Sequence, residues 1–196
     1  NKGLTKENIL HGAGLAFEGG WNKVKLYFML GQPTETIEDM KAIGELAEEI
    51  AERYYEIPKD QRNGKCQITV STSFFVPKPF TPFQWSPMCT KDEFLGRAKI
   101  VNETIKSQLN KKSIRYNWHE ADVTMIEGIL ARGDRRLCNA LIRVYEKEAS
   151  SQPGLNSSTI RSGRMRLRKN KLIQTFILPV SVRKMKSSHG ILSMQA

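Results

Sequence analysis

The stretch VKLYFMLGQPTET, residues 24–36, decides the fold of this chain. It begins with an almost entirely apolar strand pattern that leads directly into Gly31-x-Pro33, and an amphipathic helix pattern follows from Thr36. A strand, a tight polar turn and a helix form the unit from which parallel α/β folds are built. In such folds, ligands bind at the turns after the carboxyl ends of the strands. The sequence therefore predicts a ligand-facing turn over residues 31–35.

Helix and strand patterns alternate along most of the remaining chain. The sequence predicts helices over residues 5–19, 36–56, 90–109, 122–131 and 134–148, and strands over residues 24–30, 66–75 and 114–118. This alternation indicates a parallel sheet with right-handed crossovers. The strand over 24–30 has the continuous apolar pattern of a strand that is buried on both faces. Residues 76–87 contain four prolines, so no regular element is expected there.

Three strands would leave two exposed sheet edges, which makes a poor independent unit. The chain starts at Asn1 without a methionine, so we expect a piece of a longer protein. It contains no apolar run near the roughly 20 residues of a membrane span and no signal segment, and we expect a cytoplasmic protein. Cys66, Cys89 and Cys138 have spacings that fit no metal or redox motif, and reduced thiols are expected.

The basic residues are concentrated at the end of the chain. The net charge is +11, but all 20 acidic residues lie in residues 1–150 together with 22 Lys and Arg. Residues 151–196 contain nine Lys and Arg and no acidic residue. We therefore divide the chain into a domain over 1–148 and a basic tail over 149–196, whose composition predicts disorder. The alternative is a nucleic-acid-binding tail, although no aromatic residues are interleaved with its charges as stacking platforms would be.

Three segments in order resemble the radical S-adenosylmethionine (radical SAM) enzymes. The segment 24–40, VKLYFMLGQPTETIEDM, is similar to that family's fifth strand followed by Gly-x-Pro-Gly-Glu-Thr, with Thr34 in place of the second Gly. The segment 68–85, ITVSTSFFVPKPFTPFQW, is similar to the sixth strand and its loop. The segment 117–137, NWHEADVTMIEGILARGDRRL, resembles the next part of the branch that carries a cobalamin-binding domain. The resemblance covers about residues 1–147 and does not include the tail.

The resemblance implies a partial (β/α) barrel, half of a radical SAM-type TIM-like barrel. It also implies a parent enzyme that cleaves S-adenosylmethionine reductively at a 4Fe-4S cluster, with cobalamin as a further candidate cofactor. The family holds this cluster with a C-x-x-x-C-x-x-C loop, but no two cysteines of this chain are closer than 23 residues. We therefore expect no catalytic residue and no metal ligand here, and an isolated chain that is inactive. Its partner would be the missing N-terminal half of the barrel, and its substrate is unknown.

The resemblance also assigns candidate residues of the S-adenosylmethionine wall at the ends of two strands, which are Met29, Leu30, Gly31, Phe74, Phe75 and Val76. Polar residues that follow a strand or lie near a helix start are candidates for the substrate side, and they are Glu35, His119, Glu120, Arg132 and Arg135.

Each assignment has a plain structural alternative. Gly31 and Pro33 are also ordinary turn residues, and Glu35 is also a carboxylate favoured at a helix start. The two phenylalanines would then point to opposite sides of a strand. The segment from His119 to Asp122 could equally provide caps, or form the site of a cluster-free α/β enzyme built from His119, Glu120 and Asp122. The arginines after residue 131 could bind an anionic group or simply be solvated.

Overall fold

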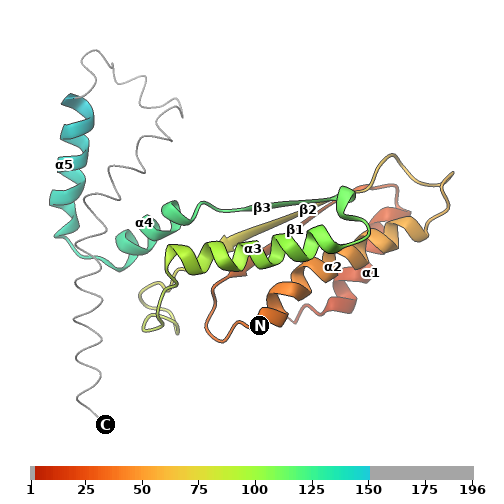
Figure 1. Cartoon of the computed structure of the whole chain (residues 1–196), viewed down its shortest axis with the longest axis horizontal. Helices are drawn as coiled ribbons and strands as arrows, with labels where there is room; N and C mark the ends of the chain where they lie inside the picture. The colour runs from red at the N-terminus through yellow and green to blue at the C-terminus, as the bar shows by residue number, and fades with distance from the viewer. Residues whose placement is uncertain (1–2, 151–196) are drawn as a thin grey trace, which may run out of the picture. The chain divides into compact units, whose positions relative to one another are not determined.

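The computed structural model of the chain describes residues 3–150, with side chains up to residue 146 (Figure 1). Its elements, in chain order, are α1 (Lys6–Glu18), β1 (Lys23–Leu30), α2 (Ile37–Glu56), β2 (Gln67–Phe74), α3 (Lys91–Ser107), a short 3-10 helix η1 (Lys111–Ser113), β3 (Ile114–Trp118), α4 (Ala121–Arg132) and α5 (Leu137–Ser150). Except for its first two residues, the tail predicted over 149–196 lies outside the described residues. The alternation predicted from the sequence is confirmed.

The three strands form one open parallel sheet in the order β1-β2-β3. Leu30 of β1 is paired with Phe74 of β2, and Thr72 of β2 is paired with Trp118 of β3. The sheet is not closed within the described residues. Because parallel strands run in the same direction, the turn after β1 and the loop after β2 begin at the same end of the sheet. This register brings two segments together that are about 40 residues apart in sequence.

Capping boxes form the N-termini of α2 and α3, the two long helices that pack on the sheet. The Thr36 hydroxyl accepts a hydrogen bond from the Asp39 backbone N–H at 3.2 Å, and the Asp39 carboxylate accepts one from the Thr36 N–H at 2.8 Å. Thr90 and Glu93 repeat this arrangement before α3, at 3.3 and 2.7 Å. Each box satisfies N–H groups that have no partner within the helix. The Thr-x-x-acid spacing that both share in the sequence is typical of such boxes.

The sheet has one covered face and one open face. On β2 the alternate residues Ile68, Val70, Thr72 and Phe74 are buried, on the side where α2 and α3 pack. The opposite row is polar and more exposed, and it consists of Gln67, Thr69, Ser71 and Ser73. The helices of the sheet unit, which is described up to residue 121, therefore cover a single face of this sheet.

The prediction that the first strand is buried on both faces is wrong. Along β1 exposed residues alternate with partly buried ones, and only Leu30 at its end is fully buried. Tyr27 and Met29 are on the open face and are 74% and 44% exposed. The strand has this pattern because it lies at an edge of the sheet, with helices on one side only. The apolar content of β1 is nevertheless typical of a strand that is buried on both faces.

The described chain forms two compact units, which we describe separately. Within the described residues, the sheet unit consists of residues 3–75 and Pro87–Ala121, and the loop–helix unit consists of Val76–Ser86 and residues 122–150. None of the described helices is long and apolar enough to cross a membrane.

Two contacts hold the proline-rich segment of the loop–helix unit to α4. Lys78 forms an ion pair with Glu127 at 2.9 Å, and the Arg132 guanidinium donates to the Ser86 carbonyl at 3.1 Å. As predicted, residues 76–86 contain no helix or strand. The last helix starts at Leu137, after the predicted start at Asp134, because the Asp134 carboxylate bonds the backbone N–H of Arg136 in a local turn.

The buried thiol of Cys66 gives the sheet unit a testable response to alkaline pH. Cys66 is 4% exposed, and burial raises the pKa of its thiol to about 11. A thiol whose pKa is raised by folding contributes stability that is fully present below its unfolded-state pKa and is lost as the pH rises toward the folded value. We expect the free energy of unfolding to fall between about pH 8.5 and pH 11 through this group. Urea unfolding across this range will measure the change.

Cys66→Ala should flatten that alkaline decline, whatever it does to stability at pH 7. Cys138→Ala provides the control, because Cys138 is exposed. An identical pH dependence in wild type and Cys66→Ala would contradict the assignment.

Candidate functional site

The segment after β1 is a tight turn of the type II pattern. The Glu35 backbone N–H donates to the Gln32 carbonyl at 3.2 Å, which closes a four-residue turn. A type II turn favours proline at its second position and requires a positive φ at its third. Pro33 fills the second position, and Thr34 fills the third with a φ of 69°. Glycine adopts this conformation with little strain, whereas a β-branched residue does not.

Gly31 immediately precedes this turn, and the structure leaves no space for a side chain there. Its φ is 84°, and an added Cβ would lie 2.7 Å from the Phe94 ring and 3.2 Å from the Cys89 sulfur. Both the backbone conformation and the close packing therefore require glycine. The turn is held against α3 through this residue.

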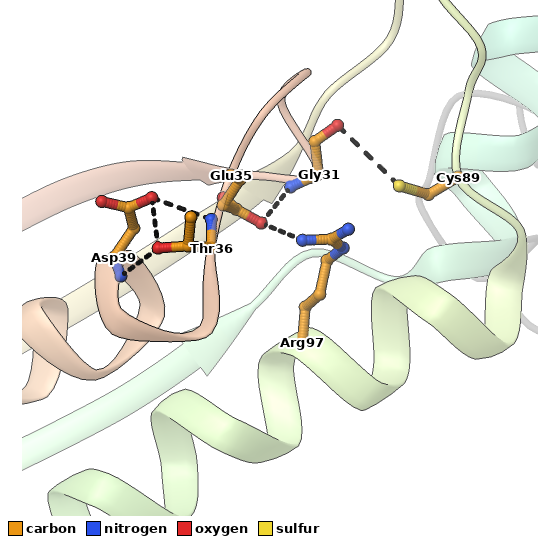
Figure 2. A network of polar contacts seen from close by, with 6 residues as sticks. All are labelled: Gly31, Glu35, Thr36, Asp39, Cys89 and Arg97. Carbon is orange, nitrogen blue, oxygen red and sulfur yellow. Dashed lines mark hydrogen bonds and ion pairs between the residues drawn. The ribbon is translucent and has the colours of Figure 1, made fainter.

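The Glu35 carboxylate holds the turn in place through two polar contacts (Figure 2). Its Oε2 accepts a hydrogen bond from the Gly31 backbone N–H at 2.9 Å and an ion-pair hydrogen bond from Arg97 of α3 at 2.6 Å. The two side chains are 8% and 24% exposed, so this pair is mostly withdrawn from water. Asp39, not Glu35, completes the cap of the following helix. Glu35 therefore connects β1, its turn and α3.

Cys89 contacts the same turn from the other side. Its thiol points at the Gly31 carbonyl, with sulfur and oxygen 3.8 Å apart (Figure 2). Burial raises the pKa of this thiol, and the positive charge of Arg97 partly opposes that effect. The thiol is therefore protonated at neutral pH and can donate to the carbonyl. Both backbone polar groups of Gly31 thus have partners within the sheet unit.

The end of β2 lies directly beside this turn. The Phe75 backbone N–H donates to the Leu30 carbonyl at 2.8 Å, which extends the pairing by one residue. The Phe74 ring stacks on Phe94 with centroids 4.5 Å apart. Leu30, Phe74 and Phe75 are all buried. Neither phenylalanine is therefore exposed to solvent, whichever side of the strand it points to. The Met29 side chain, by contrast, faces solvent.

A solvent-open cleft of about 510 Å³ adjoins the turn within the sheet unit. It lies between β1, the turn and α2. Its lining includes carboxylates, one lysine and apolar residues of α2. Its lining residues are Lys6, Phe28, Met29, Gln32, Pro33, Thr34, Glu35, Asp39, Ala42, Ile43, Glu45 and Leu46. The backbone and small polar groups of the turn are accessible from this cleft.

The other predicted site residues are divided between the two units. His119 continues the β3 pairing through its backbone N–H, which donates to the Thr72 carbonyl at 2.9 Å, and Glu120 follows it in the sheet unit. Val76, Asp122, Arg132 and Arg135 belong to the loop–helix unit. The described structure therefore does not place His119, Glu120 and Asp122 in one compact unit. The roles predicted for these residues stay predictions.

Arg97 and Cys89 were not identified from the sequence. Arg97 lies 62 residues after its partner Glu35, and no local pattern indicates such a pairing. The polar open face of β2 was also missed, although its signal is present in the sequence. Serine and threonine alternate with apolar residues from Ile68 to Phe74, and this period of two indicates one buried and one polar face.

The cysteines do not gather at this site. Cys66 is buried at the start of β2, Cys89 is half-buried beside Gly31, and Cys138 is exposed in the loop–helix unit. Among the described residues, no three His, Cys, Asp or Glu side chains converge as a metal site would require. The thiol of Cys89 contacts the turn as a packing group and weak donor.

Comparison with known proteins shows a similarity to an archaeal protein. The chain is 32% identical over 150 residues to an uncharacterised protein, MJ0966, of the archaeon Methanocaldococcus jannaschii. The match covers 76% of this chain but only 30% of the relative, so the chain spans less than a third of the relative's length. No protein-family model and no solved structure matches the chain.

Replacing Thr34 by glycine should stabilise the sheet unit. The substitution removes the strain of a β-branched residue at positive φ. We expect the free energy gained to exceed the entropic cost of a more flexible unfolded chain by about 1 kcal/mol. Thermal and urea unfolding will measure the change. Thr34→Ala is the matched control, because it removes the same side chain but keeps the strain. Equal stability of Thr34→Gly and Thr34→Ala would contradict the strain argument.

Breaking the Glu35–Arg97 pair from one side should destabilise the turn. Arg97→Met leaves a nearly buried carboxylate with the Gly31 N–H as its remaining partner, and we expect a loss of about 2 kcal/mol. Adding Glu35→Gln should recover part of that loss, because the neutral amide can still accept from Gly31. A double-mutant cycle in urea will give the coupling energy. Strictly additive losses would show that the two side chains do not act as a pair.

Proposed function

We propose that this chain is the C-terminal part of the catalytic barrel of a radical SAM enzyme, in which it supplies one wall of the S-adenosylmethionine pocket. The observation that carries the proposal is the conformation of Thr34. The family motif Gly-x-Pro-Gly-Glu-Thr has glycine at this position, and the turn has a positive φ there. Glycine adopts a positive φ without strain, so the second glycine of the motif would fit this position of the turn.

The other motif residues also have individual roles in the turn. Gly31 fits where no side chain can, and Pro33 fixes the second turn position. Glu35 accepts from the Gly31 N–H, and Thr36 caps α2. Each matching residue of the motif therefore has a structural role in the turn, and the resemblance extends beyond the letters of the sequence. This internal agreement supports the assignment to the family.

The second resembling segment supports the same proposal through its position. It covers β2 and the loop after it, and the end of β2 pairs with the end of β1 at Leu30 and Phe74. In the proposed barrel, these two strand ends line the adenine side of the pocket. The finer architecture, half of a (β/α) barrel, is part of the proposal, and the open three-stranded parallel sheet is compatible with it. The polar row of β2 would then face the barrel interior.

The residues of this chain would orient the ligand rather than react with it. A flat purine is held by an apolar wall and a few backbone hydrogen bonds, and a rigid backbone reduces the entropy lost on binding. The fastened turn offers such a backbone, and Met29 offers an exposed apolar side chain beside it. The cluster of the parent enzyme would supply the electron for cleavage. Its ligands would come from the remainder of the parent protein.

Ligand titration of the isotope-labelled chain tests the wall. We expect S-adenosylmethionine and adenosine, in the millimolar range, to shift the amide resonances of residues 29–32, 34–35 and 73–75, whereas methionine alone should not. Met29→Gln should weaken these shifts. Lys23→Gln is the matched control, because it lies on the same open face of β1 at the opposite end of the strand.

Shifts confined to other parts of the chain, or none at all, would contradict the pocket wall. Anaerobic incubation with iron and sulfide provides a second test. A stable 4Fe-4S absorbance from this chain alone would contradict the claim that the cluster ligands lie elsewhere in the parent.

A further inference from the structure

The open face of the sheet carries basic side chains at neighbouring positions of its two outer strands. In the register of the sheet, Lys25 of β1 lies beside Thr69 of β2, and Thr69 lies beside Arg115 of β3. Lys23 is on the same face of β1, two positions before Lys25. The three basic side chains are exposed, and none of them forms an ion pair with another residue of the described chain.

No acidic side chain of the three strands balances these charges on the open face. The strand residues on this face are Lys23, Lys25, Tyr27, Met29, Gln67, Thr69, Ser71, Ser73, Arg115 and Asn117. Like charges that lie close together on one face of a sheet repel each other. An anion bound between them would replace this repulsion by attraction, so the face is complementary in charge to an anionic ligand.

The spacing of the basic residues suits a single anionic group. Neighbouring strands lie about 4.8 Å apart, so the backbones at Lys25 and Arg115 are about 10 Å from each other, with Thr69 between them. Both side chains are long enough to approach one group above Thr69 from opposite sides. The guanidinium offers paired N–H donors to two oxygens, the ammonium adds a point charge, and the threonine hydroxyl is a further donor.

The central strand favours a small polar ligand over another layer of protein on this face. Its residues there are short and carry hydroxyl groups, at Thr69, Ser71 and Ser73. The covered face of the same strand has Ile68 and Val70, which fill the space beneath the helices. A second packed layer would need apolar side chains of that kind, whereas hydroxyl groups offer hydrogen bonds to a polar molecule.

We propose that the open face at Lys25, Thr69 and Arg115 binds a small molecule through a phosphate monoester group. Such a group carries close to two negative charges at pH 7, which match the two cations that flank Thr69. The inference goes beyond the proposed function and does not depend on it, because Gly31 lies about 20 Å beyond Lys25 along the strand direction. A barrel closed around this face would exclude water and strengthen the same charge pairing.

NMR titration of the isotope-labelled full chain tests the proposal, with glycerol phosphate as the probe and glycerol as its uncharged counterpart. At constant ionic strength, we expect glycerol phosphate to shift the amide resonances of residues 24–26, 68–70 and 114–116, and glycerol to leave them unchanged. The resonances at the carboxyl ends of β1 and β2, which the adenosine titration monitors, should not respond to glycerol phosphate. Failure of this site is therefore distinguishable from failure of the S-adenosylmethionine wall.

Charge-neutralising variants of the face should weaken this binding. We expect Lys25→Gln and Arg115→Gln to lower the affinity for glycerol phosphate about threefold each, because each removes one exposed charge contact, and the double variant to lower it about tenfold. Lys41→Gln of α2 and Lys106→Gln of α3 are the matched controls, since each removes an exposed positive charge elsewhere, and they should leave the affinity unchanged. Circular dichroism will confirm that each variant is folded, as expected for exposed side chains.

Three results would count against the site. A loss of affinity in the two controls as large as in the face variants would show a response to net charge alone and would overturn the proposal. Unchanged affinity in the Lys25→Gln/Arg115→Gln double variant, or shifts confined to other parts of the chain, would overturn it as well. Shifts at the expected residues with succinate, and none with glycerol phosphate, would replace it by a site for carboxylates.

Discussion

The structure of the sheet unit depends on one constraint, which is that nothing larger than hydrogen fits on Gly31. A Cβ there would collide with the Phe94 ring and crowd the Cys89 sulfur, and the Gly31 backbone N–H and carbonyl are hydrogen-bonded to Glu35 and Cys89. The carboxyl end of β1 is thereby held to α3, and the turn that follows can have only one geometry. The direction of α2, which starts at the end of this turn, follows from it.

The Glu35–Arg97 pair holds this arrangement in place, but the loss of either partner would destabilise the fold. A mostly buried carboxylate is stable only while its partners remain, so the pair specifies a geometry more than it adds stability. Arg97 Nε is buried and has no hydrogen-bond partner among the described residues. The guanidinium is positioned for Glu35, and its Nε–H donor is left unsatisfied. The strain at Thr34 is a further cost that the same turn bears.

Local signals in the sequence were sufficient for most elements of the fold. The capping boxes at Thr36 and Thr90 and the boundary at Ile57-Pro58 placed the long helices correctly, because these signals act within a single turn of chain. The burial of β1 was predicted wrongly for the opposite reason. Apolar residues indicate that a strand can be buried, whereas whether it is covered depends on which elements pack on each face.

The sequence by itself determined the parallel α/β architecture and the position of the turn at residues 31–35, because periodicity, caps and glycine or proline are properties of neighbouring residues. Only the tertiary structure decided that Arg97 and Cys89 complete this turn, that Thr34 is strained in it, and that Phe80 and Trp85 remain in solvent. These features arise from packing between segments far apart in the chain or from the exposure of a folded loop. No local pattern of residues encodes contacts of that kind.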